Sequence, residues 1–380
     1  MYDYLRIQTT AEGILLIMNT NYTIHAILPF YNTPVDRLDK CISSVLTQTH
    51  KNFKLYIIDD GSNQFCAGYL DKYLTLDSRI LVLHKENGGV SSARNYGMQI
   101  LSERLTDIDH YQLLTFIDSD DYLEPNAWET AISHLDRTNS DAVVFSWTDV
   151  YPNQENIPHY VTAEHSCSTH SKFLQMMEEI AKGNMADFKT DHPKELTFSG
   201  RNFVKEISSD NIYCGGGYPW NKIWRILSIA TPDLKLPIYD ETLHIYEDKL
   251  WCIQAASHCN NISVISDKLY NYVYFSDSIT RQDNEVIDRQ PAAYAAFDRI
   301  LDYLQTYDME CYQAAYNFFF DVIYDDIAIL TDDKHKASHK QQYKSTMATY
   351  RRLCKRIKPR TLLYPVKSPQ FRSWALHHFL

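Results

Sequence analysis

The sequence lacks the features of disulfide-bonded and membrane-spanning proteins. Eight cysteines are spread over 380 residues, and none forms a Cys-x-x-Cys pair. Because no secretory signal peptide is evident, we expect free thiols in a reducing cytoplasm. The apolar segment Gly13–Met18 is far too short to cross a bilayer. Residues 1–20 therefore read as a leader or an appended start, to which we assign no role.

Glycine is scarce, with 11 residues in all, and none follows Gly217. A long region without glycine suits helices, so we expect the chain from about residue 286 to be helical. Acidic residues are absent between Lys334 and Leu380, where twelve Lys or Arg occur. Since the formal net charge of the whole chain is −11, the preceding body is strongly acidic. A basic tail of this kind would suit an anionic membrane surface, a polyanionic acceptor or nucleic acid.

The composition that remains is that of a folded chain. An apolar content of 44% and an aromatic content of 13% are sufficient for a sizeable core. The 28 tyrosines would suit sugar binding, because their rings stack on C–H surfaces, but they would equally serve an ordinary core and surface. At this length we expect two globular parts followed by a tail.

Short apolar segments alternate with helical patterns through the first 150 residues. The expected strands cover residues 24–28, 54–58, 80–83, 112–117 and 142–145. This alternation predicts an α/β fold with a doubly wound, mostly parallel sheet. In such sheets ligands bind beyond the carboxyl ends of the strands, so the residues that follow these strands should share one site.

Two acidic clusters follow strands of the predicted sheet. Asp59-Asp60 ends the second strand, and Asp118-Ser-Asp-Asp121 ends the strand 112–117. Carboxylates one residue apart, as in Asp118 and Asp120, would hold a divalent cation and a sugar hydroxyl together, and hard oxygen ligands suit Mg²⁺ or Mn²⁺. Taken alone, an Asp-x-Asp sequence is more often an ordinary acidic turn.

The acidic clusters belong to an ordered series of motifs at strand ends. The series is Pro29-Phe-Tyr-Asn32, Asp59-Asp-Gly-Ser62, Asn87-Gly-Gly-Val-Ser-Ser-Ala-Arg-Asn-Tyr-Gly97 and Phe116-Ile-Asp-Ser-Asp-Asp121. It resembles family 2 of the inverting glycosyltransferases, which have the GT-A fold. The resemblance is close over residues 23–130 and returns at 218–224, 246–251 and 276–281. It does not cover the chain beyond about residue 290.

The resemblance implies a donor site for a nucleotide-sugar, with uridine as the preferred base. Pro29 and Tyr31 would line the base, and Asp60 would bond its edge. The remaining donor residues would be Arg94 near the phosphates, Asp118 on ribose or sugar hydroxyls, and Ser278 and Arg281 over the diphosphate. Asp120 would ligate the metal, and Asp121 would assist it or cap a helix. Asp59, Gly61 and Ser62 would equally serve only to shape a turn, and Asn95 to brace its loop.

The resemblance also implies a general base in the second half of the domain. The match is Glu247-Asp248, in which Asp248 would take the proton of the acceptor hydroxyl and Glu247 is the fallback. Many relatives have a glycine before this pair, whereas this chain has Tyr246. The same acidic pair would also suit the N-terminus of an ordinary helix. We expect the acceptor to contact Tyr218, Trp220 and Lys222, with Ile223 and Trp224 in the core.

We therefore expect a GT-A-like α/β fold with a mixed acceptor region and a helical C-terminal appendage. The nucleotide-sugar-binding half would cover residues 21–127, the acceptor-binding and catalytic-base half 128–285, and the helical region with its basic tail 286–380. The expected activity is inverting, metal-dependent transfer of a sugar, from a UDP-sugar for preference, to an acceptor hydroxyl. Cell-envelope polysaccharide or glycoconjugate synthesis is the expected setting.

The expected acceptor is a saccharide or a lipid-linked or protein-linked glycan. The basic tail would either lie on the anionic inner face of the cell membrane or pack as a helix on the acidic body, within one subunit or between subunits of a homo-oligomer; no nucleic-acid partner is expected. One alternative is a sugar-phosphate nucleotidyltransferase, although Pro29–Asn32 replaces the glycine-rich basic loop of that class. The other is a non-catalytic nucleotide-binding or saccharide-binding module, against which the complete set of acidic motifs argues.

Overall fold

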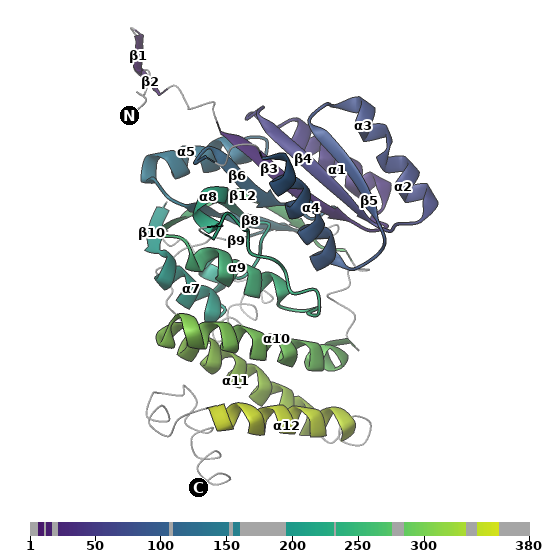
Figure 1. Ribbon diagram of the computed structural model, residues 1–380, viewed down its shortest axis with the longest axis vertical. Coiled ribbons are helices and arrows are strands. Elements are labelled where there is room, and N and C mark those ends of the chain that lie inside the picture. Colours follow the sequence, from purple (N-terminus) through teal and green to yellow (C-terminus); the bar gives the residue numbers. More distant parts are fainter. Residues whose placement is uncertain are drawn as a thin grey trace.

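The protein is seen in a computed structural model that describes residues 7–10, 13–16, 22–105, 109–151, 155–159, 195–231, 233–275, 285–331 and 340–356 (Figure 1). The described residues form a ten-stranded sheet with packed helices, and a layer of C-terminal helices lies beneath it. A separate two-stranded antiparallel hairpin, β1 (Ile7–Thr10) and β2 (Gly13–Leu16), precedes this domain.

The first half of the sheet is parallel, as its short apolar strands predict. The strand order is β6-β3-β4-β5, and every neighbouring pair runs in the same direction. The bounds are β3 (Thr23–Phe30), β4 (Phe53–Asp60), β5 (Ile80–Lys85) and β6 (Gln112–Phe116). These strands are buried along most of their length because helices cover them, which explains their unbroken apolar runs. Their carboxyl ends therefore meet at one edge.

Four helices connect these strands or follow them. They are α1 (Val35–Leu46), α2 (Gln64–Leu70), α3 (Lys72–Leu76) and α4 (Val90–Arg104). Helix α1 buries Leu38, Cys41, Ile42 and Val45, which recur at helical spacing. Pro34 directly precedes the first helical turn.

The second half of the sheet is mixed, as predicted. Strand β11 (Lys222–Arg225) lies antiparallel between β6 and β8 (Ala142–Val150), while β12 (Asn261–Val273) runs parallel to β8. The remaining strands are β7 (Tyr122–Leu123), β9 (Ile157–His159) and β10 (Glu195–Ser199). The helices of this half are α5 (Ala127–Thr138), α7 (Gly200–Ser208), η2 (Ile212–Cys214), α8 (Ile226–Ile229) and α9 (Glu247–Ser257). Ile223 and Trp224 are fully buried, so their predicted place in the core is confirmed.

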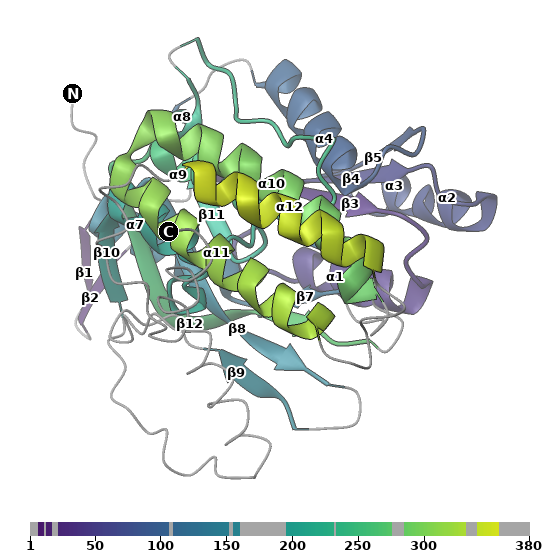
Figure 2. The same cartoon turned by 90° about the horizontal axis from the view of Figure 1, so that it is seen from below.

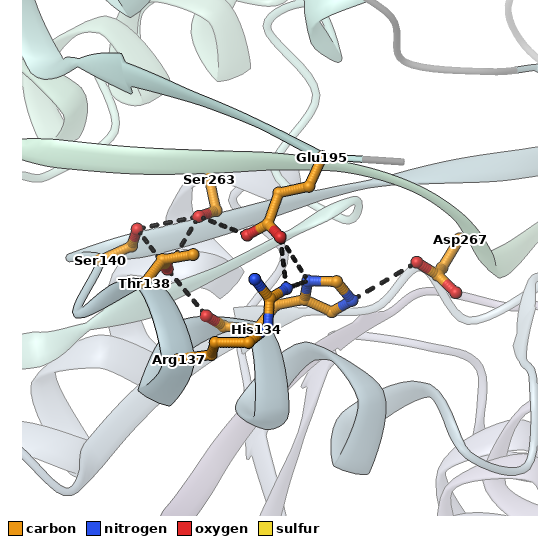
Figure 3. A network of polar contacts seen from close by, with 7 residues as sticks. All are labelled: His134, Arg137, Thr138, Ser140, Glu195, Ser263 and Asp267. Atoms are coloured by element: carbon orange, nitrogen blue, oxygen red, sulfur yellow. Dashed lines mark hydrogen bonds and ion pairs between the residues drawn. The ribbon is translucent and has the colours of Figure 1, made fainter. Parts of the chain in front are cut away.

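A polar network fastens the β10 edge of the sheet to the end of α5 (Figure 3). Glu195 of β10 forms an ion pair with Arg137 and lies 3.3 Å from Nδ1 of His134, both of which come from α5. The hydroxyl oxygens of Ser140, in the loop before β8, and of Ser263 in β12 lie 2.9 Å apart and join that loop to β12. This network lies at the opposite end of the sheet from β4 and β5.

The C-terminal region is helical, as the scarcity of glycine predicts. It contains α10 (Glu285–Tyr307), α11 (Met309–Thr331) and α12 (Lys340–Arg356), which lie across one face of the domain (Figure 2). Helix α11 packs on α7, and α10 packs on α9. The rings of Phe297 and Phe319 stack with their centroids 3.9 Å apart. Ile300, Leu301 and Leu304 of α10 are fully buried and recur at helical spacing, so one face of this helix packs into the core.

Part of the basic tail packs on the acidic body. Arg352 and Arg356 of α12 both pair with Asp298 of α10, and Arg356 also pairs with Asp302. The packing hypothesis for the tail therefore holds for the described residues 340–356. Residues 357–380 lie outside the described part of the chain.

No helix in the described ranges is both long enough and apolar enough to cross a membrane. The seven cysteines that fall within those ranges carry free thiols, as predicted from their spacing.

Candidate active site

The loops after β3 and β4 are tied together at the edge where the parallel strands end. The side-chain oxygen of Asn32 accepts hydrogen bonds from the backbone and side-chain nitrogens of Asn63, at 2.9 and 2.7 Å. Tyr31, beside it, is 56% exposed, whereas Pro29 is buried within β3. Of the two residues predicted at the base, Tyr31 thus has a ring face that a ligand could reach, and Pro29 belongs to the strand.

Asp60 organises the loop that leads into α4. Its carboxylate accepts hydrogen bonds from the backbone nitrogens of Gly88, at 3.0 Å, and Gly89, at 2.7 Å, and from Nζ of Lys85 at 2.5 Å. Gly89 has a φ of +87°, which a residue with a side chain rarely adopts, so the turn depends on glycine. Asp60 is only 3% exposed. Its contact with a base remains a prediction, and in this structure the carboxylate holds the loop.

Asp59 shapes a turn, which is the structural role considered for it from the sequence. Its carboxylate accepts a hydrogen bond from the backbone nitrogen of Ser62 at 3.0 Å and lies 2.6 Å from Nδ1 of His84. This hydrogen bond to Asp59 raises the pKa of His84 above its ordinary value. Nε2 of His84 lies 3.1 Å from Asp71, so an imidazolium ion here would bridge two carboxylates.

Arg94 connects the two halves of the predicted site. It projects from α4 and is only 5% exposed. Its Nη2 donates to Oδ1 of Asp118 at 3.1 Å, and its Nη1 lies 3.8 Å from Oε1 of Glu247. Its Nε has no hydrogen-bond partner within the described residues. A permanent cation therefore lies between the Asp118–Asp121 turn and the Glu247-Asp248 pair.

The Asp118–Asp121 turn contains carboxylates in two different environments. Asp118 and Asp120 are partly exposed, whereas Asp121 is only 1% exposed. Asp121 accepts hydrogen bonds from the hydroxyl of Tyr270 at 2.9 Å and from the backbone nitrogen of Val273 at 2.7 Å. Burial, followed by the charges of Asp120 and Asp118, raises its pKa well above the usual range. Asp121 therefore anchors the turn to β12 and leaves Asp118 and Asp120 as the accessible carboxylates.

This turn fits a divalent cation of the kind that a diphosphate brings with it. Within the described ranges, no three His, Cys, Asp or Glu side chains gather closely enough to form a metal cage. Mg²⁺ is commonly held by one or two carboxylates, with phosphate oxygens and water completing its shell. Partly exposed Asp120, with Asp118 two residues away, offers that donor set. Metal binding by Asp120 remains a prediction.

Asp248 lies in the first turn of α9, next to Glu247. Burial, followed by the charge of Glu247, raises the pKa of Asp248 to about 7, although Arg94 and Lys249 oppose the shift. A carboxyl group with a pKa near 7 can both accept and release a proton at neutral pH. Tyr246, which precedes the pair, has a φ of +61° and a ψ of +14°. The left-handed conformation explains why glycine would suit this position.

The predicted acceptor residues are placed unequally. Tyr218 is half-buried, and its ring stacks on Trp220 with centroids 5.2 Å apart. Trp220 is only 6% exposed because Tyr270 and Tyr272 also cover it, so it supports Tyr218 more than it offers a surface of its own. Tyr218 is thus the member of the pair that an acceptor could reach.

The buried position of Lys222 contradicts its predicted contact with the acceptor. It is fully buried, and its Nζ donates hydrogen bonds to the carbonyl oxygens of Gly215, Gly216 and Tyr218 and to the side-chain oxygen of Asn221. Burial lowers its pKa to about 8. Lys222 shapes the glycine-rich loop from within. Sequence reasoning missed this because a lysine is rarely fully buried.

The remaining predicted residues either have structural roles or lie outside the described residues. Asn95 braces its loop, since it exchanges hydrogen bonds with the backbone of Tyr239 at 3.0 and 2.8 Å. Ser278 and Arg281 lie outside the described residues. Tyr270, which the sequence reading missed, links Asp121 to the aromatic stack on Trp220. Its separation from Asp121 is 149 positions, and no local motif marks it.

Comparison with known proteins defines the class to which this arrangement belongs. Residues 25–203 match the model of glycosyl transferase family 2. The putative glycosyltransferase EpsH of Bacillus subtilis (strain 168) is 25% identical over 291 residues, which are 76% of this chain and 72% of EpsH. Glycosyltransferase GlyG of Streptococcus pneumoniae serotype 4 (strain ATCC BAA-334 / TIGR4) is 28% identical over 203 residues. That alignment covers 50% of this chain and slightly less than two thirds of GlyG, 64%.

Solved structures agree on the fold. The crystal structure of S. aureus TarS 1-349 in complex with UDP-GlcNAc matches with a TM-score of 0.60 and 17% sequence identity, covering 87% of this chain and 81% of that chain. At this identity the likeness establishes the fold alone, and it confirms the predicted GT-A-like architecture. With the strand-end motifs and the family match, the chain is a glycosyltransferase, and its residues 25–203 are similar to glycosyl transferase family 2.

Proposed function

We propose that this glycosyltransferase moves a sugar from a UDP-sugar to an acceptor hydroxyl, with inversion at the anomeric carbon. The observation that carries the proposal is the position of Arg94 between Asp118 and Glu247. It places the strand-end carboxylates, where a diphosphate with its cation would bind, beside the acidic pair that includes Asp248. The matching TarS structure is a complex with UDP-GlcNAc, which supports uridine as the base.

In the proposed reaction the residues of this chain have distinct tasks. Arg94 counters the negative charge of the leaving nucleoside diphosphate with a planar guanidinium group. Asp248 accepts the proton of the acceptor hydroxyl as that oxygen attacks the anomeric carbon, and its pKa near 7 suits the transfer. Asp120 would hold Mn²⁺ or Mg²⁺, which would act as a Lewis acid toward the diphosphate, and Asp118 would contact the ribose or sugar hydroxyls of the donor. Tyr218 would form the surface for the acceptor sugar.

Calorimetric titration with UDP, GDP, CDP and TDP, each with and without Mn²⁺, tests the donor proposal. We expect UDP to bind most tightly and its affinity to rise with Mn²⁺. In Asp120→Asn the increase should disappear, whereas the matched control Glu103→Gln, on the exposed end of α4, should keep it. Absence of nucleotide binding in the parent protein would contradict the donor site. NMR of the product's anomeric proton would then report inversion or retention.

For the acceptor we propose a glycan of the cell envelope or an exopolysaccharide, carried on a lipid or a protein. The family resemblance supports this choice. Binding of the basic residues of α12 to an anionic membrane would bring the protein to a lipid-carried acceptor. Four exposed basic residues of α12 recur at spacings of four and seven residues, which places them on one face of the helix. They are Lys340, Lys344, Arg351 and Lys355.

Vesicle sedimentation tests the membrane contact. Phosphatidylserine vesicles should retain the protein at low salt, and phosphatidylcholine vesicles should not, because the exposed face of α12 offers charge without large apolar side chains. Reversal of charge in Lys344→Glu and Arg351→Glu should abolish retention, whereas Lys51→Glu, on a distant loop, should leave it unchanged. Equal binding to both kinds of vesicle would contradict an electrostatic contact.

A further inference from the structure

The residue that precedes the acidic pair holds an unusual backbone conformation. Tyr246 has a φ of +61°, in the left-handed region that residues with side chains rarely occupy, and α9 begins directly after it. Asp248 is only two residues further along the chain. The dihedral angles of Tyr246 therefore set the direction in which the first helical turn, and with it the Asp248 carboxylate, leaves the preceding loop.

The side chain of Tyr246 is held by the C-terminal helices. Its ring packs against Phe297 of α10, with centroids 5.4 Å apart. The ammonium group of Lys249 lies 4.9 Å from the centroid of the Tyr246 ring and 4.4 Å from that of Phe318 in α11. The same ammonium group forms an ion pair with Asp210. Phe297 of α10 thus contacts Tyr246 directly, and Phe318 of α11 is linked to it through the ammonium group of Lys249.

The glycine-rich loop also packs against this helical turn. A Cβ atom built on Gly217 would lie 2.7 Å from both Cα and Cβ of Lys249, so the glycine-rich loop lies directly against α9. Gly217 lies against Lys249, and the rings of Phe297 and Phe318 contact Tyr246 and Lys249 respectively. Figure 1 shows α9 between the sheet and α10. The beginning of α9 therefore has little freedom to shift.

We propose that Tyr246 is a positioning residue for Asp248, and that α10 by direct contact, and α11 through Lys249, serve the reaction by holding Tyr246 in its left-handed conformation. The inference rests on the proposed function, because it takes Asp248 as the general base. The C-terminal helices thereby take part in catalysis, although they are far in sequence from the motifs at the strand ends. Tyr246 itself acts through the backbone and needs no contact with substrate.

Three substitutions at Tyr246 separate the backbone from the ring. Tyr246→Phe keeps the ring contacts, so its kcat should match that of the parent. Tyr246→Ala keeps the strain and loses the anchor, so its kcat should fall by about 10- to 100-fold, as expected for a misplaced catalytic group. Tyr246→Gly adopts the left-handed conformation freely and should recover much of that loss. The KM for the donor and the affinity for UDP should stay within about twofold throughout.

The pH profile supplies a readout that a loss of stability alone would not change. Burial is the largest influence on the pKa of Asp248, followed by the charges of Glu247, Arg94 and Lys249. The other titratable groups that interact with it are Lys222, Tyr218, Tyr239, Tyr246 and Cys252. In Tyr246→Ala the displaced carboxyl group should become more hydrated, so the acidic limb of the kcat profile should move below its parent midpoint. Tyr246→Phe should keep the parent midpoint. Alanine and glycine variants with equal kcat, or an unmoved profile in Tyr246→Ala, would overturn the proposal.

A matched pair of substitutions tests the role of the helices. Phe297→Ala removes the ring that contacts Tyr246, whereas Phe320→Ala removes a buried ring of α11 that packs on Tyr316 and Tyr350 instead. At a temperature where both variants are folded by circular dichroism, Phe297→Ala should lower kcat and Phe320→Ala should not. Equal effects would overturn the part assigned to α10. Full activity in Asp248→Asn would instead remove the base assignment, and the UDP titration would still report separately on the donor site.

Discussion

The guanidinium group of Arg94 donates a hydrogen bond from Nη2 to Oδ1 of Asp118 over 3.1 Å. Helix α4 thereby brings a permanent positive charge to the end of strand β6. The other terminal nitrogen of Arg94 lies 3.8 Å from Glu247, at the start of α9. One buried side chain thus connects the Asp118–Asp121 turn of the first half of the domain to the acidic pair of the second half.

Replacement of Arg94 by lysine should reduce catalysis although the charge is retained. A lysine ammonium group is a point charge. It lacks the planar guanidinium through which arginine can contact Asp118, Glu247 and a diphosphate together. We expect kcat/KM to fall by about 10- to 100-fold, each factor of ten being about 1.4 kcal/mol of transition-state stabilisation. Steady-state kinetics will measure it. Arg299→Lys, at an exposed pair with Asp240, is the control and should match the parent.

Replacement of Asp248 by asparagine should remove transfer and preserve donor binding. Asparagine keeps the shape of the side chain but cannot accept a proton, and loss of a general base costs about 10²- to 10⁴-fold in rate. The affinity for UDP, measured by calorimetry, should change little. Glu247→Gln should retain more activity than Asp248→Asn. The reverse order would transfer the role of base to Glu247, and full activity in both variants would exclude the pair.

The rate should rise with pH across neutrality. A general base is active when deprotonated, and the pKa of Asp248 is raised to about 7, so kcat should increase from about pH 5 to about pH 8 with a midpoint near 7. Stability should change in the opposite sense. Between the ordinary pKa of an aspartate, 3.8, and about 7, the folded state binds a proton that the unfolded state has released, so the free energy of unfolding falls as pH rises.

The difference between Asp248→Asn and the parent tests this linkage. Asparagine resembles the protonated carboxyl group, so the variant should gain thermal stability relative to the parent at pH 8 and much less at pH 5. Differential scanning calorimetry at the two pH values will show it. A variant less stable than the parent at pH 8 would mean that the ionised carboxylate is stabilised by its neighbours, contrary to a raised pKa.

Replacement of Asp60 by asparagine should destabilise the loop that positions α4. Asparagine cannot accept from Gly88, Gly89 and Lys85 together, and it leaves the ammonium group of Lys85 without its counter-charge. Removing one partner of a largely buried pair is costly, and with Lys85 partly solvated we expect a loss of about 2 kcal/mol in the free energy of unfolding. Urea denaturation will measure it, and affinity for UDP should fall too.

The network at the far edge of the sheet provides a control for that experiment. Arg137 is an exposed partner of Glu195 (Figure 3), so Arg137→Ala should cost about 1 kcal/mol or less. Its kcat and its affinity for UDP should equal those of the parent, because the network is separated from the parallel strand ends by the width of the sheet. Loss of UDP affinity in Arg137→Ala would show that stability alone explains the effect at Asp60.

Much of the fold follows from local pattern. The apolar runs that form β3, β4, β5 and β6 predict buried parallel strands, because only a strand covered on both faces tolerates uninterrupted apolar residues. Asp59-Asp60 and Asp118–Asp121 are expected at one edge for the same topological reason. The sequence also indicates the helical C-terminal region, whose stripe at Ile300, Leu301 and Leu304 is buried.

The candidate site could be predicted only in part, because burial of polar side chains depends on neighbours distant in sequence. Lys222 is expected at the surface near the acceptor, yet four oxygens enclose its ammonium group. Tyr270 carries no motif, yet its hydroxyl anchors Asp121 across 149 residues. Asp60 is expected to face a ligand, and the contacts that hold it come from the backbone of the following loop.

The sequence by itself determined the order of strands and helices in the first 150 residues, the acidic residues at strand ends and the resemblance to family 2. These features depend on side-chain periodicity and on short motifs, which act over a few residues. Only the tertiary structure decided which charges meet. Arg94 joins Asp118 to Glu247, and Phe297 and Phe318 support the turn that carries Asp248, because packing of a sheet against helices brings together residues that no local pattern relates.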